Sequence, residues 1–100
     1  FALSFINRLH FDKCFITSAC VSAAFGLSIQ KSRSVELTNA VISHSKTVYG
    51  LYPFEKIGFD SVISICSADR LHCLITDGET AEDELEKFED LGMKIIIAQA

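Results

Sequence analysis

The stretch Thr47–Gly58, Thr-Val-Tyr-Gly-Leu-Tyr-Pro-Phe-Glu-Lys-Ile-Gly, determines how the rest of the chain can be arranged. Its first half is a run of β-branched, aromatic and aliphatic residues that ends at Pro53, which predicts a buried strand. Proline has no backbone N–H, so the strand should stop there and leave Phe54–Gly58 as a loop at its carboxyl end. Lys56 lies at the centre of this loop. It is either simply solvated or placed to meet an anion.

The composition limits the classes of function. One hundred residues with 49% apolar and 22% charged residues predict one globular domain with a hydrophobic core. A net charge of −4, with nine scattered Lys and Arg residues, argues against a nucleic-acid interface on this chain. The uncharged stretch Cys14–Ile29 is too short and too rich in Ser, Thr and Gly to span a membrane.

The cysteines and histidines show no spacing typical of a metal site, so we expect no metal and no cofactor. Buried thiols and the lack of a secretory signal favour a reducing cytoplasm. The chain begins without Met, and its first apolar residues fall on one helical face, so we expect a fragment that opens inside a helix.

The remaining elements follow from local patterns. Cys14–Thr17 reads as a buried strand, Ser18–Ser34 as a long loop, and Ser34–Lys46 as a helix. In the second half we expect strands at Val62–Cys66, Cys73–Thr76 and Met93–Ala98. A helix capped by Thr80 and Asp83 and stopped by Gly92 precedes the last of these strands, with Leu85, Phe88 and Leu91 on its buried side and a solvated acidic outer face.

These elements predict an α/β fold with a mostly parallel sheet flanked by helices on both faces. In such sheets ligands bind beyond the carboxyl ends of the strands. Three loops should therefore share one edge: Thr17–Val21, Pro53–Gly58 and Thr76–Gly78. A lysine beside Ser, Thr and exposed backbone N–H groups is suited to cradle a phosphate.

An ordered set of short motifs also resembles the effector domain of DeoR-type bacterial transcriptional regulators. The motifs are Asp12-Lys13-Cys14-Phe15-Ile16, Val21-Ser22, Phe25-Gly26-Leu27, Glu36, Lys56-Ile57-Gly58 and Leu74-Ile75-Thr76-Asp77. The resemblance covers nearly the whole chain. It implies a fold similar to ribose-5-phosphate isomerase and glucosamine-6-phosphate deaminase, of which residues 1–100 would be the later part of a single domain.

The same resemblance implies a function and partners. The domain would sense a phosphorylated sugar, DNA would be bound only by an absent amino-terminal winged helix-turn-helix, and the regulator would be a homo-oligomer. The family's loop pattern is Asp-x-Ser-Lys-Phe-Gly, of which this chain keeps Lys56 and Gly58. It has Pro53, Glu55 and Ile57 at the other positions, and Cys20 where the family usually has Gly.

These departures bear on the site, because Glu55 would either repel a phosphate or pair with Lys56, and Cys20 narrows the approach of a ligand to the backbone. The candidate ligand-binding residues are Thr17, Ser18, Cys20, Lys56, Gly58 and Asp77. Asp77 is equally well explained as a turn residue between strand and helix.

Two other functions stay open. One is a sugar-phosphate isomerase or deaminase. The stretch Ser18–Ser22 argues against this function, because it contains no carboxylate that could act as a base. The other is an oligomerisation scaffold with a vestigial pocket. We expect a sensor domain that is not an enzyme.

Overall fold

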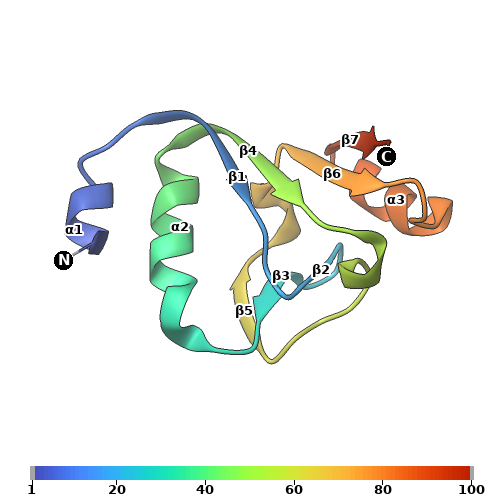
Figure 1. Cartoon of the computed structure of the whole chain (residues 1–100), viewed down its shortest axis with the longest axis horizontal. Helices are drawn as coiled ribbons and strands as arrows, with labels where there is room; N and C mark the ends of the chain where they lie inside the picture. Colours follow the sequence, from blue (N-terminus) through green and yellow to red (C-terminus); the bar gives the residue numbers. More distant parts are fainter. Residues whose placement is uncertain (1, 100) are drawn as a thin grey trace.

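The computed structural model describes residues 2–99 and contains two β-sheets with three α-helices. Figure 1 shows the arrangement of these elements. In chain order they are α1 (Ala2–Ile6), β1 (Phe11–Ile16), β2 (Cys20–Ser22), β3 (Gly26–Ile29), η1 (Ser32–Ser34), α2 (Val35–Ser43), β4 (Ser45–Leu51), η2 (Phe54–Lys56), β5 (Ile63–Cys66), η3 (Ala68–Arg70), β6 (Cys73–Asp77), α3 (Glu82–Glu89) and β7 (Lys94–Ala98), where η marks a 3-10 turn.

The larger sheet is the predicted parallel sheet, in the order β1-β4-β6-β7. The α/β fold class is therefore confirmed. The strand expected from Thr47 begins at Ser45, because Ser45 pairs with Phe11 at the start of β1. For the same reason α2 ends at Ser43 and not at Lys46, and β1 begins three residues before Cys14.

The second sheet, β2-β3-β5, is antiparallel and was not predicted. The expectation of one long loop over Ser18–Ser34 was wrong, because this segment holds the β2–β3 hairpin. The strand at β5 pairs with β3 and does not join the parallel sheet. Gly26 makes the close approach of these elements possible: its φ is +86°, and a Cβ there would overlap the carbonyl oxygen of Cys66.

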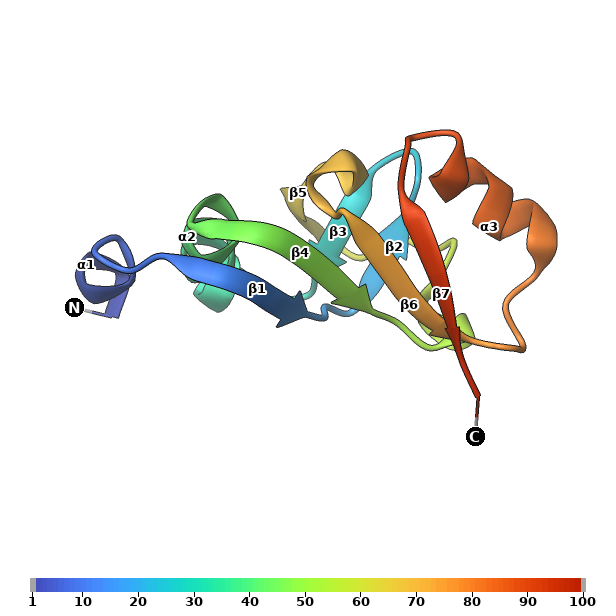
Figure 2. The same ribbon diagram turned by 90° about the horizontal axis from the view of Figure 1, so that it is seen from above.

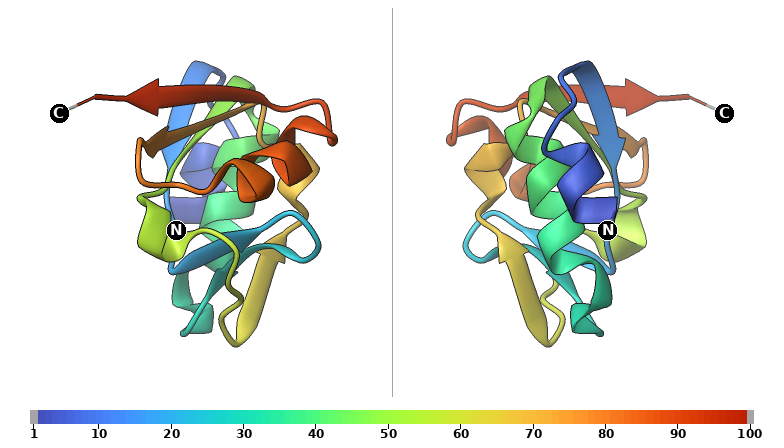
Figure 3. Two further views of the ribbon diagram at one scale, coloured as in Figure 1. Left: turned by 90° about the vertical axis from the view of Figure 1, so that its right-hand side faces the viewer. Right: turned by 90° about the vertical axis from the view of Figure 1, so that its left-hand side faces the viewer.

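One hydrophobic core joins the parallel sheet to the other elements. Val48 and Leu74 contribute from the sheet, Ile42 from α2, Phe88 from α3 and Leu27 from the small sheet, and all are at most 3% exposed. Figures 2 and 3 show that α2, α3 and the small sheet lie on the same face of the parallel sheet. Within residues 2–99 the sheet is thus covered on one face, whereas we expected covering on both.

The predicted helix caps differ from those observed. Ala81 occupies the N-cap of α3 and makes no side-chain cap hydrogen bond, so Thr80 and Asp83 do not form a capping box. The Thr80 hydroxyl instead lies 2.7 Å from that of Thr76. Gly92 ends the helix with a φ of +85°, as expected, but Leu91 is 44% exposed and not part of the buried side. No helix within the described range is long and apolar enough to cross a membrane.

Candidate functional site

The carboxyl ends of β1, β4 and β6 are neighbours, which brings the three predicted loops to one edge of the sheet. Backbone hydrogen bonds tie these loops together. The N–H of Tyr52 donates to the carbonyl of Ile75 at 3.0 Å, and the N–H of Gly58 donates to the carbonyl of Val21 at 2.8 Å. Ile57 also forms a parallel β-bridge with Val21. The loop that carries Lys56 is therefore fixed both to the parallel sheet and to the small sheet.

A buried hydroxyl pair joins the loop after β1 to the end of β4. Ser18 Oγ lies 2.7 Å from the hydroxyl oxygen of Tyr52 and donates to the carbonyl of Cys20 at 3.0 Å. The single Ser18 proton is used in that second bond, so Tyr52 donates to Ser18. Burial raises the pKa of Tyr52 to about 12, against a smaller opposing effect of the Ser18 hydrogen bond. This pair is neutral at physiological pH and positions the two loops.

The loop after β4 presents Lys56 as predicted. Pro53 precedes the 3-10 turn η2, in which Lys56 is the last residue and is partly exposed. The only ion pair formed within residues 2–99 joins Lys87 to Glu84, so Glu55 does not neutralise Lys56. Gly58 has a φ of +88°, and a Cβ there would lie 3.0 Å from the Glu84 carboxylate. The conformation of the loop therefore depends on this glycine.

Asp77 acts as a turn residue, which is one of the two roles that the sequence allowed. Its carboxylate accepts hydrogen bonds from the N–H of Phe54 at 3.1 Å and from the N–H of Glu79 at 2.9 Å. The first bond joins the loop after β4 to the end of β6, and the second closes the turn that follows β6. Asp77 thereby links the Lys56 loop to the segment that leads into α3.

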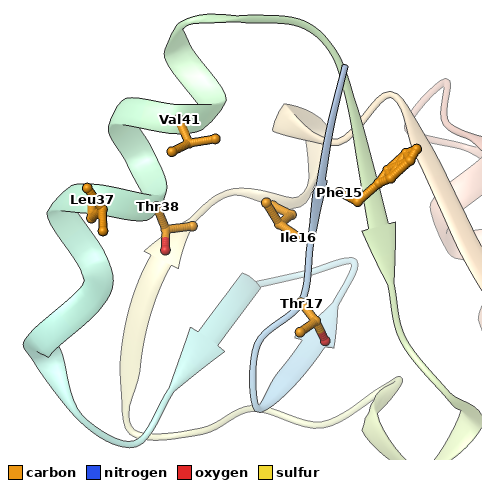
Figure 4. Close-up of a pocket in the computed structure, with 6 residues that line it drawn as sticks. All are labelled: Phe15, Ile16, Thr17, Leu37, Thr38 and Val41. Atoms are coloured by element: carbon orange, nitrogen blue, oxygen red, sulfur yellow. The ribbon is translucent and has the colours of Figure 1, made fainter. Parts of the chain in front are cut away.

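Two depressions flank this edge. The first has a volume of about 270 Å³ and lies between the end of β1 and α2, where Thr17 is exposed (Figure 4). Its lining is mostly apolar: Phe15, Ile16, Thr17, Leu37, Thr38 and Val41. The second, of about 410 Å³, lies between η2 and the start of α3. Three carboxylates, those of Glu55, Glu79 and Glu84, line it and make it unfavourable for an anion.

The six candidate residues thus share one edge but have different tasks. Lys56 and Thr17 present polar side-chain atoms for which no hydrogen bond is found within residues 2–99. Ser18, Gly58 and Asp77 serve the protein's own architecture, and Cys20 is half-buried at the start of β2. Sequence reasoning missed Tyr52, which it treated only as a strand residue. Its place directly before Pro53, at the end of a buried strand, is the signal that could have indicated a role at this edge.

No group of three or more His, Cys, Asp or Glu side chains within the described part of the chain is arranged to hold a metal ion. Apart from the carboxylates that line the second depression, this edge offers the Lys56 ammonium group, the Thr17 hydroxyl and backbone N–H groups. Such groups bind an oxyanion by hydrogen bonding and charge.

Two comparisons with known proteins bear on this edge. The chain is 28% identical over 94 residues to the HTH-type transcriptional regulator GolR of Listeria innocua serovar 6a (strain ATCC BAA-680 / CLIP 11262). That alignment covers 94% of this chain but 37% of the regulator, so the chain spans little more than a third of the length of this relative. The family model described as the DeoR C terminal sensor domain matches residues 1–78, which include the loops after β1 and β4 and end at Gly78, directly after β6. The chain belongs to the family of DeoR C-terminal sensor domains.

Proposed function

We propose that this domain binds a phosphorylated sugar or a related metabolite at the edge formed by the loops after β1, β4 and β6. The observation that carries the proposal is the juxtaposition of these loops around Lys56, whose ammonium group makes no ion pair within residues 2–99. An ammonium group in a fixed loop is suited to a phosphate. The acidic depression beside α3 favours a phosphate position on the other side of η2, toward the loop after β1.

The residues divide into two roles in this proposal. Lys56 and Thr17 contact the ligand directly. Ser18, Cys20, Gly58 and Asp77 hold the loops in place through the contacts described above, so we assign them positioning roles. Glu55 lies beside Lys56 and lowers the affinity for a dianionic phosphate, which leaves room for a ligand of smaller negative charge.

The sensor family and the relative's description as a transcriptional regulator support a wider proposal. Residues 1–100 would be the later part of one sensor domain, DNA would be bound by another domain of the same chain, and the ligand would change operator affinity. The folds of ribose-5-phosphate isomerase and glucosamine-6-phosphate deaminase are the comparison that we propose for the complete domain. Neither the family description nor that of the relative names an enzymatic activity.

A thermal-shift series on the full-length regulator tests the ligand. We expect sugar phosphates to raise the melting temperature in proportion to the logarithm of their concentration, and the unphosphorylated sugars to have no effect. Lys56→Ala should abolish the shift. Lys46→Ala is the matched control, because Lys46 is an exposed lysine at the opposite end of the same strand, β4. An equal shift in both variants would contradict the assignment of Lys56.

The second candidate is a scaffold whose pocket no longer binds a ligand. The hydrogen bonds that use Ser18 and Asp77 within the protein favour this alternative, because these groups are not free for a ligand. It predicts no thermal shift with any sugar phosphate, together with an oligomeric state that Lys56→Ala leaves unchanged.

A further inference from the structure

A further depression lies against the small sheet and is lined by none of the candidate ligand-binding residues. It has a volume of about 270 Å³ and lies where β3 and β5 meet the segment that leads into β5. In Figure 1 this segment passes below β2 and β3 and then turns into β5. Its lining combines apolar and hydrogen-bonding side chains, as small-molecule sites usually do. The six lining residues are Phe25, Ser28, Asp60, Ser61, Val62 and Ser64.

Hydrogen bonds between distant segments hold this depression in shape. The hydroxyl oxygen of Ser28 accepts the N–H of Ser61 at 2.8 Å. The hydroxyl of Ser22 donates to the Asp60 carboxylate at 2.6 Å, and its oxygen accepts the N–H of Phe25 at 3.1 Å. These bonds join the β2–β3 hairpin to the segment before β5. A ligand would therefore meet a site that is already formed, which lowers the entropy cost of binding.

The apolar side chains of the depression face solvent. Phe25 is 70% exposed and Val62 is 85% exposed, which makes them the two most exposed large hydrophobic side chains within residues 2–99. Single exposed hydrophobic residues are common on protein surfaces, but these two line the same depression. The flat face of an uncovered phenylalanine ring is a platform on which another planar ring can stack.

Two polar groups of the depression have hydrogen-bonding capacity that the described part of the chain does not use. Ser28 is only 3% exposed, and its hydroxyl proton has no acceptor within residues 2–99. A buried donor without an acceptor is unfavourable, so it is suited to a ligand that accepts its proton. One oxygen of the Asp60 carboxylate accepts the Ser22 hydroxyl, whereas the other accepts no hydrogen bond and forms no ion pair within the same residues. The depression thus offers one buried donor and one charged acceptor.

We propose that this depression binds a neutral planar heterocycle that carries neighbouring hydrogen-bond donor and acceptor groups, as a nucleobase does. The ring stacks on Phe25 and contacts Val62, while its acceptor atom receives the Ser28 proton and its N–H group donates to Asp60. The volume lies just below the range of about 300–1,000 Å³ for drug-sized ligands, which suits a single ring system. The Asp60 carboxylate repels a phosphate, so the site selects a free base or nucleoside over a nucleotide. The inference is independent of the ligand proposed for Lys56.

A second copy of the chain is the other occupant that the exposed apolar side chains allow. The centre of a contact between protein chains is depleted of charged residues. Here the Asp60 carboxylate lines the same depression as Phe25 and Val62, together with the unpaired Ser28 proton. This combination favours a small ligand with polar atoms, and the test below separates the two occupants.

Saturation-transfer NMR on the full-length protein tests the inference with adenosine, guanosine, cytidine and uridine, none of which carries a phosphate. We expect saturable binding of at least one of them. Phe25→Ala should raise its Kd at least about fivefold, because the stacking face is removed. Phe59→Ala is the matched control and should leave the Kd unchanged, since Phe59 is 59% exposed but lines the neighbouring depression beside α3.

Asp60→Asn tests the hydrogen bonds separately from the stacking. The amide keeps an oxygen that accepts the Ser22 hydroxyl, but it presents an N–H donor in place of the free carboxylate oxygen. The order of preference among the four nucleosides should therefore change. A residue that only shapes the loop would weaken all four equally, which would contradict the contact assigned to Asp60.

The absence of saturable binding for all four nucleosides would overturn the proposal, as would equal losses of affinity in Phe25→Ala and Phe59→Ala. Sedimentation velocity covers the remaining outcome: if Phe25→Ala dissociates an oligomer of the wild-type protein, the depression is a contact between copies and the proposal is also wrong. Cooperative thermal unfolding verifies that each variant is folded. If Phe25→Ala does not fold, the order of preference in Asp60→Asn decides between the outcomes.

Discussion

The Tyr52 hydroxyl should stabilise the folded protein at neutral pH and destabilise it at alkaline pH. Tyr52→Phe should therefore have opposite effects on the free energy of unfolding at the two pH values. At about pH 8 the hydroxyl is neutral and forms the buried hydrogen bond to Ser18, so Tyr52→Phe should lower the free energy of unfolding by about 1 kcal/mol. In the folded protein the pKa of Tyr52 is raised to about 12 from the ordinary value of 10.0. The resulting stabilisation is fully present below pH 10 and is lost as the pH rises from 10 to 12.

The size of this loss follows from the two pKa values. Their difference corresponds to about 3 kcal/mol when the residue is fully ionised, and to about 2 kcal/mol at about pH 11.5. The wild-type protein loses this amount, whereas Tyr52→Phe does not. The phenylalanine variant should therefore become the more stable of the two, by about 1 kcal/mol, at about pH 11.5.

Urea unfolding of the full-length protein at the two pH values measures this crossing, with the slope of the transition checked for each variant. Comparison of variant with wild type removes the contribution of lysines and other groups that titrate in the same range. Tyr49→Phe is the control: the chain's other tyrosine is changed while Tyr52 is retained, so the alkaline loss should remain. A constant difference between wild type and Tyr52→Phe at both pH values would refute the burial of this hydroxyl.

Three further tests concern packing and hydrogen bonding. Gly26→Ala should lower the free energy of unfolding by more than about 3 kcal/mol, because the new Cβ overlaps backbone atoms. Gly92→Ala should lower it by about 1 kcal/mol, because Gly92 has a similar φ but open space around it. Equal urea midpoints for the two variants would contradict this. Asp77→Ala should cost about 1–2 kcal/mol in the same assay, since two backbone N–H groups lose their acceptor. Phe88→Ala should cost about 3–5 kcal/mol and Leu91→Ala less than about 1 kcal/mol, because only the first side chain is fully buried; a reversed order would show that α3 packs differently.

The parallel sheet could be predicted because its signals are local and strong. Apolar runs that end at a proline or follow a helix and a glycine mark β4 and β7 within a few residues. The small sheet could not be predicted in this way. β2 and β3 have three and four residues, several of them Ser, Cys or Gly, and too few for a periodic pattern. The pairing of β3 with β5 also joins segments more than thirty residues apart, which no local pattern encodes.

The candidate site, too, could be predicted only in part. The convergence of three loops follows from the geometry of parallel strands and needs only the order of the elements. Which polar groups are free for a ligand depends on individual hydrogen bonds. The partners of Ser18 and Asp77 lie 34 and 23 residues away in the sequence, at Tyr52 and Phe54. Polar residues that resemble a ligand-binding site in the sequence therefore include groups whose hydrogen bonds are already formed within the fold.

The pairing of the strands also sets the order in which the chain can fold. The hairpin of β2 and β3 closes over a few residues, so it can form early. Every contact of the parallel sheet is distant in sequence: Phe11 pairs with Ser45, and the pair Cys73 and Lys94 joins the last strand. Loop-closure entropy opposes such pairings until much of the chain is collapsed. During synthesis the parallel sheet is therefore complete only after β7 has left the ribosome, and until then its apolar strands are exposed to aggregation.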